Sequence, residues 1–277
     1  MARTNARDIY INDNDKDKLA EIYGGVIEAV QKGAISEQIK NKNYSGDPTS
    51  GSVEISRFVN AQVKDQGTAR ANAKGDKVIN KPVTVNVDTD KEIVEEFNKL
   101  DLKLHGVTGI AEKRKGNHIK RMQAYLDREF FGCAESEGTE FEMTGDTIIE
   151  KLESLILDVE ETDNEFVDGV DRELLVLTVK PTIYSAIKLH INEVANSLTG
   201  VTDKFFNNVR IFPNHRQTKD AICMIDGAVA QPVVTDEYDL EKINLSNNYG
   251  LELFFSKGTK AIMPDLIKYA NLSSESV

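Results

Sequence analysis

The chain has 277 residues, enough to bury a sizeable core as one large domain or two smaller ones. It carries 34 Lys and Arg against 46 Asp and Glu, and its formal charge of −12 argues against a protein that wraps duplex DNA, which must neutralise phosphates. The N-terminus has no apolar segment typical of a secretory signal, and no run of about 18 apolar residues could span a membrane. The two cysteines, Cys133 and Cys223, are too few for a disulfide framework, and we expect buried thiols in a reducing compartment.

The first half of the chain is predicted to combine helices with one pair of strands. Apolar residues at spacings of three and four indicate amphipathic helices, and a strand on either side of a long polar stretch indicates an extended hairpin. We expect Asp15 or Asp17 to cap the first helix. The predicted elements are an arm over 1–14, a helix over 15–32, strands over 52–59 and 83–88, a short helix over 91–100 and a long helix over about 108–134.

The second half is predicted to contain two helices and a series of short strands. The run 173–179 is continuously apolar and indicates a buried strand. We expect 260–264 to pair back on 251–255 across the turn at 256–259. Because strands and helices do not alternate regularly, the fold class is α+β rather than a doubly wound sheet. The remaining predicted elements are helices over 146–159 and 184–198 and strands over 208–212, 221–225 and 229–234.

Charge is segregated along the sequence. Residues 57–81 contain two acids and six bases, a net charge of +4, and residues 135–173 contain fifteen acids and two bases, a net charge of −13. Each segment alone is explained as a solvated surface. Together they suggest that a basic hairpin on one subunit lies across an acidic surface of the next, since complementary potentials fix register. The predicted inter-subunit contact residues are Arg57, Lys64, Arg70, Lys74, Lys77 and Lys81.

The triplet Asp13-x-Asp15-x-Asp17 resembles the start of a calcium loop. Such a loop needs Gly at its sixth position and Glu at its twelfth, where this chain has Lys18 and Gly24. We therefore interpret the three acids as helix-capping residues.

The triplet Asp88-x-Asp90-x-Glu92 lies at a predicted strand-to-helix junction. A metal-dependent enzyme could use such a cluster, but acids are also favoured at the N-terminus of a helix. The sequence contains no zinc-protease, nucleophile-elbow or phosphate-loop motif. We expect no catalytic residue, no metal and no cofactor.

The order of the parts resembles that of the major capsid proteins of tailed bacteriophages, which have the Hong Kong 97-like fold. Residues 52–87 resemble the extended loop of that family, the E-loop, and HIKRMQAYLDREFF resembles its spine helix. LLVLTVKPTIYSAIK resembles the strand–Pro–helix step of its axial domain. IDGAVAQPVVTDEY and YGLELFFSKGTKAIMPDLI resemble its closing segments.

This resemblance implies an α+β capsid fold with an N-terminal arm, an E-loop hairpin, a peripheral domain (P-domain) with a long spine helix, and an axial domain (A-domain). The implied divisions are an arm and helix over 1–48, the E-loop over 49–87, the P-domain over 88–142, the A-domain over 143–247 and a return to the P-domain over 248–277. Some members form Lys–Asn crosslinks, but the Asn and Glu partners of Lys64, Lys74 and Lys77 have no match in this chain.

The resemblance also implies a function. The chain would assemble with itself into pentamers and hexamers of an icosahedral shell around double-stranded DNA, without sequence-specific contact and without a membrane. Because the first predicted helix follows Met1 within about 15 residues, we expect a separate scaffolding protein, or none. A portal and a maturation protease are further implied partners, and assembly is expected in the host bacterial cytoplasm. The alternative is an encapsulin-type nanocompartment shell, which shares the fold but packages proteins.

Overall fold

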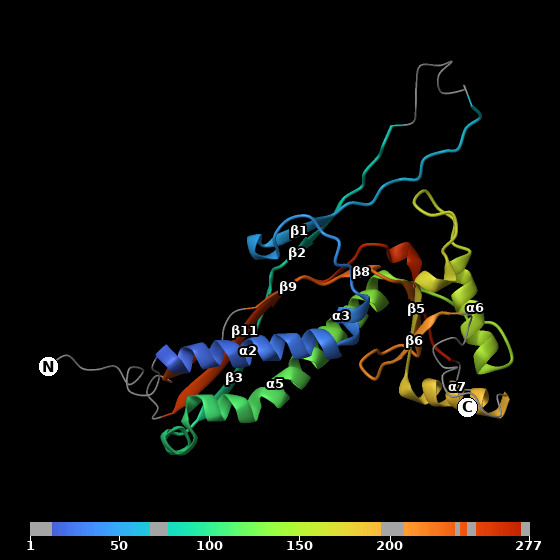
Figure 1. Ribbon diagram of the computed structural model, residues 1–277. Helices are drawn as coiled ribbons and strands as arrows, with labels where there is room; N and C mark the ends of the chain where they lie inside the picture. Colours follow the sequence, from blue (N-terminus) through green and yellow to red (C-terminus); the bar gives the residue numbers. More distant parts are fainter. Residues whose placement is uncertain (1–12, 67–76, 195–207, 236–238, 243–247, 273–277) are drawn as a thin grey trace.

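The computed structural model describes residues 13–66, 77–194, 208–235, 239–242 and 248–272 (Figure 1). Three parts are visible: an elongated layer of two helices on a sheet, a second sheet flanked by helices, and a long hairpin that extends away from both. None of the described helices combines the length and the apolar character that a membrane crossing requires.

The elongated layer is built from two long helices and a four-stranded antiparallel sheet. Apolar side chains from both helices meet one face of the sheet, with Val26, Met122, Leu126, Leu251 and Leu253 among the buried residues. Its elements are α2 (Asp13–Gly33), α5 (Lys99–Glu137), β3 (Thr89–Phe97), β9 (Val233–Thr235), β10 (Asp239–Lys242) and β11 (Tyr249–Lys257).

The second sheet has five strands in the order β4–β13–β7–β5–β6. One face packs against the helices α6 (Ile148–Glu160) and α7 (Pro181–Val194). The opposite face packs against the C-terminal end of α5 through Phe130 and Phe131, so the long helix connects the two sheets. The strands are β4 (Thr139–Glu140), β5 (Leu175–Val179), β6 (Arg210–Pro213), β7 (Ala221–Ile225) and β13 (Ile267–Ala270).

A buried polar contact lies where α5 passes between the two sheets. Asp127 is fully buried and accepts hydrogen bonds from the backbone nitrogen of Ser36 at 2.9 Å and from its hydroxyl at 2.7 Å. The same carboxylate forms an ion pair with Arg216. Asp127 therefore ties the short helix α3 (Ile35–Ile39) and the loop after β6 to the long helix.

The hairpin begins with β1 (Ser52–Ile55), which pairs antiparallel with β2 (Val83–Asn86). The short elements η1 (Pro48–Ser50), η2 (Arg172–Leu174), β8 (Val229–Ala230), β12 (Lys260–Ala261) and η4 (Pro264–Leu266) complete the described chain.

Most predicted elements are confirmed, but three predictions are wrong. The short helix expected over 91–100 is the strand β3, because all nine of its residues pair with β11. Asp15 and Asp17 do not cap the first helix, which already begins at Asp13. The segment after the turn at 256–259 does not pair back on β11, since β12 pairs with β8 instead.

Candidate assembly site at the base of the hairpin

The two arms of the hairpin remain connected beyond β1 and β2. Val59 donates from its backbone nitrogen to the carbonyl of Ile79 at 3.0 Å, and Lys81 donates in the same way to Arg57 at 2.8 Å. The side chain of Asn80 accepts from the backbone nitrogen of Arg57 at 3.1 Å. Residues 56–60 and 79–82 therefore form an ordered segment, which we call the stalk.

A cation from the stalk is held by the body of the same subunit. The guanidinium of Arg57 donates to Asp265 at 2.6 Å and lies 3.8 Å from the ring centroid of Phe166. Asn164 donates to the same Asp265 oxygen at 2.6 Å, and its own side-chain oxygen accepts from the backbone of Phe166 and Val167. We call this set of residues the clamp.

The second stalk cation contacts the same loop of the body. Lys81 forms an ion pair with Glu165 at 2.6 Å, and the backbone nitrogen of Asn60 donates to the Glu165 carbonyl at 2.9 Å. Both ion-pairing side chains are about half exposed, whereas the Arg57 side chain is only 13% exposed. The Arg57 contact therefore carries more of the clamp's free energy, because solvent screens exposed pairs.

The electrostatics of the clamp favour an ionised Asp265. Burial raises the pKa of this carboxyl, but the hydrogen bonds and charge of Arg57 outweigh that effect and hold the pKa below its usual value. The clamp is therefore a charged contact at neutral pH and fixes the direction in which the stalk leaves the body.

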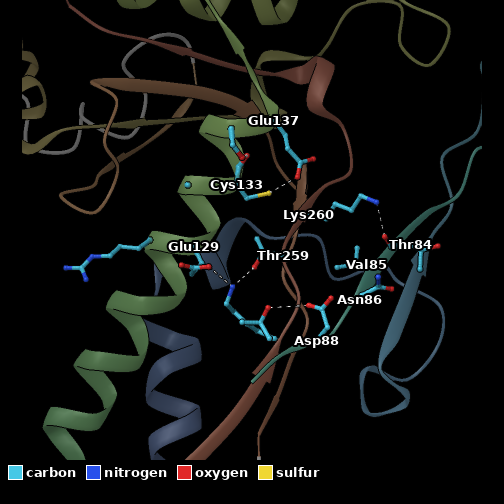
Figure 2. Close-up of a pocket in the computed structure, with 14 residues that line it drawn as sticks. Thr84, Val85, Asn86, Asp88, Glu129, Cys133, Glu137, Thr259 and Lys260 are labelled. Carbon is cyan, nitrogen blue, oxygen red and sulfur yellow. Dashed lines mark hydrogen bonds and ion pairs between the residues drawn. The ribbon is translucent and has the colours of Figure 1, made fainter. Parts of the chain in front are cut away.

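A polar groove of about 530 Å³ lies between the hairpin base and the long helix. Figure 2 shows Thr84, Val85 and Asn86 on one side and Glu129, Cys133 and Glu137 of α5 on the other. Lys260 lies between them and donates to the carbonyl of Thr84 at 3.1 Å. The groove leaves this part of α5 accessible beside the hairpin.

Only one of the two thiols expected to be buried is so, since Cys223 is buried and Cys133 is half-buried. Cys133 donates to Glu137 at 3.5 Å, and burial together with the nearby carboxylate raises its pKa to about 12 (Figure 2). Cys223 is fully buried and burial likewise raises its pKa. Both cysteines are free, and a thiol rather than a thiolate is a poor nucleophile.

Comparison with known proteins identifies this architecture. No family model and no curated protein sequence matches the chain. A solved structure from Mycobacterium phage Che8 matches with a TM-score of 0.60 at 16% identity, over 80% of this chain and 84% of that one. The capsid structure of the cyanophage P-SCSP1u matches with a TM-score of 0.58 at 12% identity, over 87% and 88%. The chain has the Hong Kong 97-like capsid fold.

A third similar structure is a virus-like particle from Pyrococcus furiosus, with a TM-score of 0.56 at 14% identity. The match covers 91% of this chain and 98% of that chain. The capsid divisions remain a prediction, in which the hairpin corresponds to the E-loop, α5 to the spine helix, most of the elongated layer to the P-domain and the central strands of the five-stranded sheet to the A-domain. The clamp joins the hairpin to Asp265 and to the loop that contains Asn164 and Phe166 within one subunit.

The structure separates the six predicted contact residues of the E-loop into three groups. Arg57 and Lys81 contact the clamp and the loop of their own subunit, as described above. Lys64 and Lys77 are exposed on the two arms. Arg70 and Lys74 lie outside the described residues. No contact between subunits is present in the structure, so the inter-subunit role of these residues stays a prediction.

Exposed apolar residues on the E-loop are a feature that the sequence reading missed. Phe58 is 55% exposed, Val63 fully exposed, Val78 85% exposed and Ile79 50% exposed. The signal was present in the sequence as four large apolar side chains next to the basic residues, but the polar composition of the segment obscured it. Four uncovered apolar side chains on a projecting hairpin indicate a surface that another molecule covers.

The acidic triplet does not form a metal site in this structure. Asp90 and Glu92 lie on the strand β3 and not at a helix N-terminus, and Asp90 accepts a hydrogen bond from Ser256 at 2.6 Å. Within the described part of the chain, no group of three or more His, Cys, Asp or Glu side chains could hold a metal ion.

Proposed function

We propose that this chain is the major capsid protein of a tailed bacteriophage, assembling into pentamers and hexamers of an icosahedral shell around double-stranded DNA. The observation that carries the proposal is the E-loop, which projects from the body with apolar side chains that its own subunit leaves exposed. The capsid fold supports a structural rather than a catalytic role.

The E-loop is proposed to dock on a neighbouring subunit through its distal part, while its base is held by its own subunit. The clamp orients the stalk, and the exposed apolar residues Val63 and Val78 together with the basic residues of the loop then contact the neighbour. The acidic segment 135–173 remains the proposed partner surface. Glu165 supports this proposal, since it belongs to that segment and forms an ion pair with Lys81 within one subunit.

The domain division is part of the proposal. We assign 1–48 to the arm and first helix, 49–87 to the E-loop, 88–142 to the P-domain, 143–247 to the A-domain and 248–277 to the return. Strand pairing adds one detail: β11 of the returning segment pairs with β3, whereas β13 pairs with β4 and β7. The last segment therefore contributes to both sheets.

Charge reversal on the E-loop tests its role in assembly. Replacing Arg70, Lys74 and Lys77 together with Glu should block or weaken shell formation and leave the far-ultraviolet circular dichroism spectrum unchanged. The matched control reverses Lys42, Lys103 and Lys188, which alters the net charge equally at exposed positions outside the loop. Electron microscopy of the purified particles gives the result, and normal assembly of the E-loop variant at low salt would show that the loop's charge does not contribute to docking.

A second candidate function is an encapsulin-type nanocompartment, which is favoured by the similarity to the virus-like particle from Pyrococcus furiosus. The contents of purified particles distinguish the two. Packaged double-stranded DNA supports the phage capsid, and a packaged enzyme supports the nanocompartment. For the phage capsid we further propose assembly in the host bacterial cytoplasm with a separate scaffolding protein, a portal and a maturation protease, or none of these.

A further inference from the structure

The spine helix carries a row of exposed cations on the side that faces away from the core. Lys113, Lys120, Arg121 and Arg128 are all exposed, and we call these four residues the basic stripe. Lys120, Arg121 and Arg128 follow Lys113 by seven, eight and fifteen residues, which places all four within about 100° around the helix axis. At about 1.5 Å per residue the stripe is about 22 Å long. The buried residue Met122 lies on the opposite side of the helix.

The basic stripe has no internal counter-charge. None of its four side chains forms an ion pair with any residue that the structure describes, and Lys113 contacts the ring nitrogen Nδ1 of His105 at 3.2 Å. The neighbouring Arg114, in contrast, binds Glu95 of β3, and Glu129 binds Lys257 at 2.8 Å. Asp127 and Glu129, the acids of α5 on either side of Arg128, are therefore directed to other partners.

The surface between these cations is small and polar. Gly116 and Asn117 are exposed and Ala124 is half-buried, so no large apolar side chain interrupts the stripe. Protein interfaces are centred on buried aromatic and apolar anchors and are depleted in lysine. A row of long, unpaired cations without such anchors is instead typical of contacts with a phosphate backbone.

The other side of the P-domain has the opposite charge. The outward positions of β3 and β11 alternate with the core positions, and they include Asp90, Glu92, Glu96 and Glu252. No lysine or arginine stands at an outward position of these two strands, since Lys91 and Lys257 belong to the core-facing set. Positive charge is therefore gathered on the stripe of α5, and negative charge on the outward face of the sheet. The helical side also carries exposed acids beside the stripe, at Glu21, Glu28 and Glu112.

We infer that the basic stripe binds the phosphate backbone of duplex DNA, so that the spine helix faces the interior of the shell and the acidic face of the β3–β11 sheet points outward. This inference rests on the proposed capsid function. It also reconciles a chain of net charge −12 with a DNA cargo, because only the inner side needs to be positive. The contact is independent of sequence, since phosphates carry no base information.

A DNA-binding measurement tests the stripe without requiring a shell. The unassembled full-length chain is titrated against a fluorescent duplex of about 30 base pairs at several salt concentrations. One variant has all four stripe residues changed to Gln, and the control variant has Lys32, Lys42, Lys103 and Lys188 changed to Gln. Both variants lose four positive charges. Removal of four phosphate contacts should lower the slope of log K against log salt by up to about 3.6, while the control variant keeps the slope of the wild type. Equal slopes for both variants would overturn the inference.

A labelling experiment on assembled shells tests the orientation. Lys120→Cys and Glu92→Cys are each reacted with a maleimide attached to a folded protein too large to enter the shell, and wild type gives the background from its own cysteines. We expect labelling at position 92 only, with both positions labelled after the shells are dissociated.

Labelling at position 120 on intact shells would overturn the orientation. If neither variant nor wild type forms shells, the capsid function fails, and the salt slopes still decide whether the stripe binds DNA. A stripe variant that loses assembly but keeps its DNA affinity would mark the stripe as a protein contact and overturn the inference.

Discussion

Replacing Arg57 with methionine should loosen the E-loop at its base while leaving the body of the subunit folded. The change keeps an unbranched aliphatic side chain and removes the guanidinium that binds Asp265 and lies over the Phe166 ring. Asp265 retains one hydrogen bond from Asn164 and is partly exposed, so water can compensate some of the loss. The hairpin would then open more often from the A-domain loop without unfolding of either sheet.

The size of the effect follows from the contacts of Arg57. A hydrogen bond to a charged group contributes about 1.5–3 kcal/mol, and a partly exposed cation–π contact contributes about 0.5–1 kcal/mol. Because only 13% of the Arg57 side chain is exposed, little of this is lost to solvent screening, and we expect a decrease of about 2–3 kcal/mol in the free energy of local opening. That decrease corresponds to hydrogen exchange that is about 30- to 150-fold faster.

Hydrogen exchange followed by mass spectrometry measures this opening. The informative amide is that of Asn60, because its hydrogen bond to the carbonyl of Glu165 exists only while the hairpin base is closed on the body. The amide of Val59, which bonds to Ile79 within the hairpin, should exchange at an unchanged rate. Lys81→Met is the matched control, because its ion pair with Glu165 is about half exposed on both sides and should contribute at most about 1 kcal/mol. Equal acceleration in both variants, or less than about threefold in Arg57→Met, would refute the role of the clamp.

Three further predictions concern stability. Asp127→Ala should lower the free energy of unfolding by about 3–5 kcal/mol, because it removes the acceptor of a fully buried network. A decrease of less than about 1 kcal/mol in urea titration would contradict this. Gly258→Ala should disturb the contact between the turn after β11 and β2, since the new Cβ would lie 2.0 Å from the backbone oxygen of Asn86. In contrast, the Cβ of Gly116→Ala meets nothing within 4 Å, and this change should raise the melting temperature. The lowered pKa values of Asp265 and Glu95 contribute stability that is complete above about pH 4 and is lost as the pH falls through the folded-state pKa values, so acid titration of D265N should show a smaller loss below about pH 4 than wild type.

The sequence predicted the helices and the buried strands because their apolar periodicity reports directly which side is buried. The apolar series Ile119, Met122, Leu126 and Phe130 was sufficient to place the long helix. The last three are buried in the structure, and Ile119 is half-buried against the same core as Met122 and Leu126. The positive φ of 68° at Gly106, which bends the start of α5, has no such periodic signal.

The strand β3 shows where local reasoning fails. KEIVEEFNKL is rich in Lys and Glu, residues that favour helices, and the prediction followed that propensity. The same residues also alternate, with Ile93 and Phe97 toward the helices and Val94 toward solvent. Nine pairs with β11, which is more than 150 residues away, outweigh a propensity of a few tenths of a kcal/mol per residue.

The clamp could not be predicted from sequence for a related reason. Arg57 and Asp265 are 208 residues apart, and their meeting depends on the placement of η4 beside the hairpin base. Charge counting predicted Arg57 and Lys81 as contacts between subunits, together with the four other bases of the segment, and did not distinguish among the six. The structure distinguishes the bases that hold the hairpin from those that are exposed on its arms.

This distinction has a consequence for docking of the E-loop. Ordering a backbone residue costs about 1–2 kcal/mol, so a hairpin that became ordered only on its neighbour would lose much of the free energy of its contacts. Here the stalk is already ordered by the clamp up to Asn60 and Ile79, so docking need not reduce the conformational entropy of these residues further. The exposed side chains of Val63 and Val78 can then contribute their burial, about 1.5–3 kcal/mol each, more fully to association. Loss of the clamp should therefore weaken assembly even though the ion pair of Arg57 with Asp265 lies within one subunit.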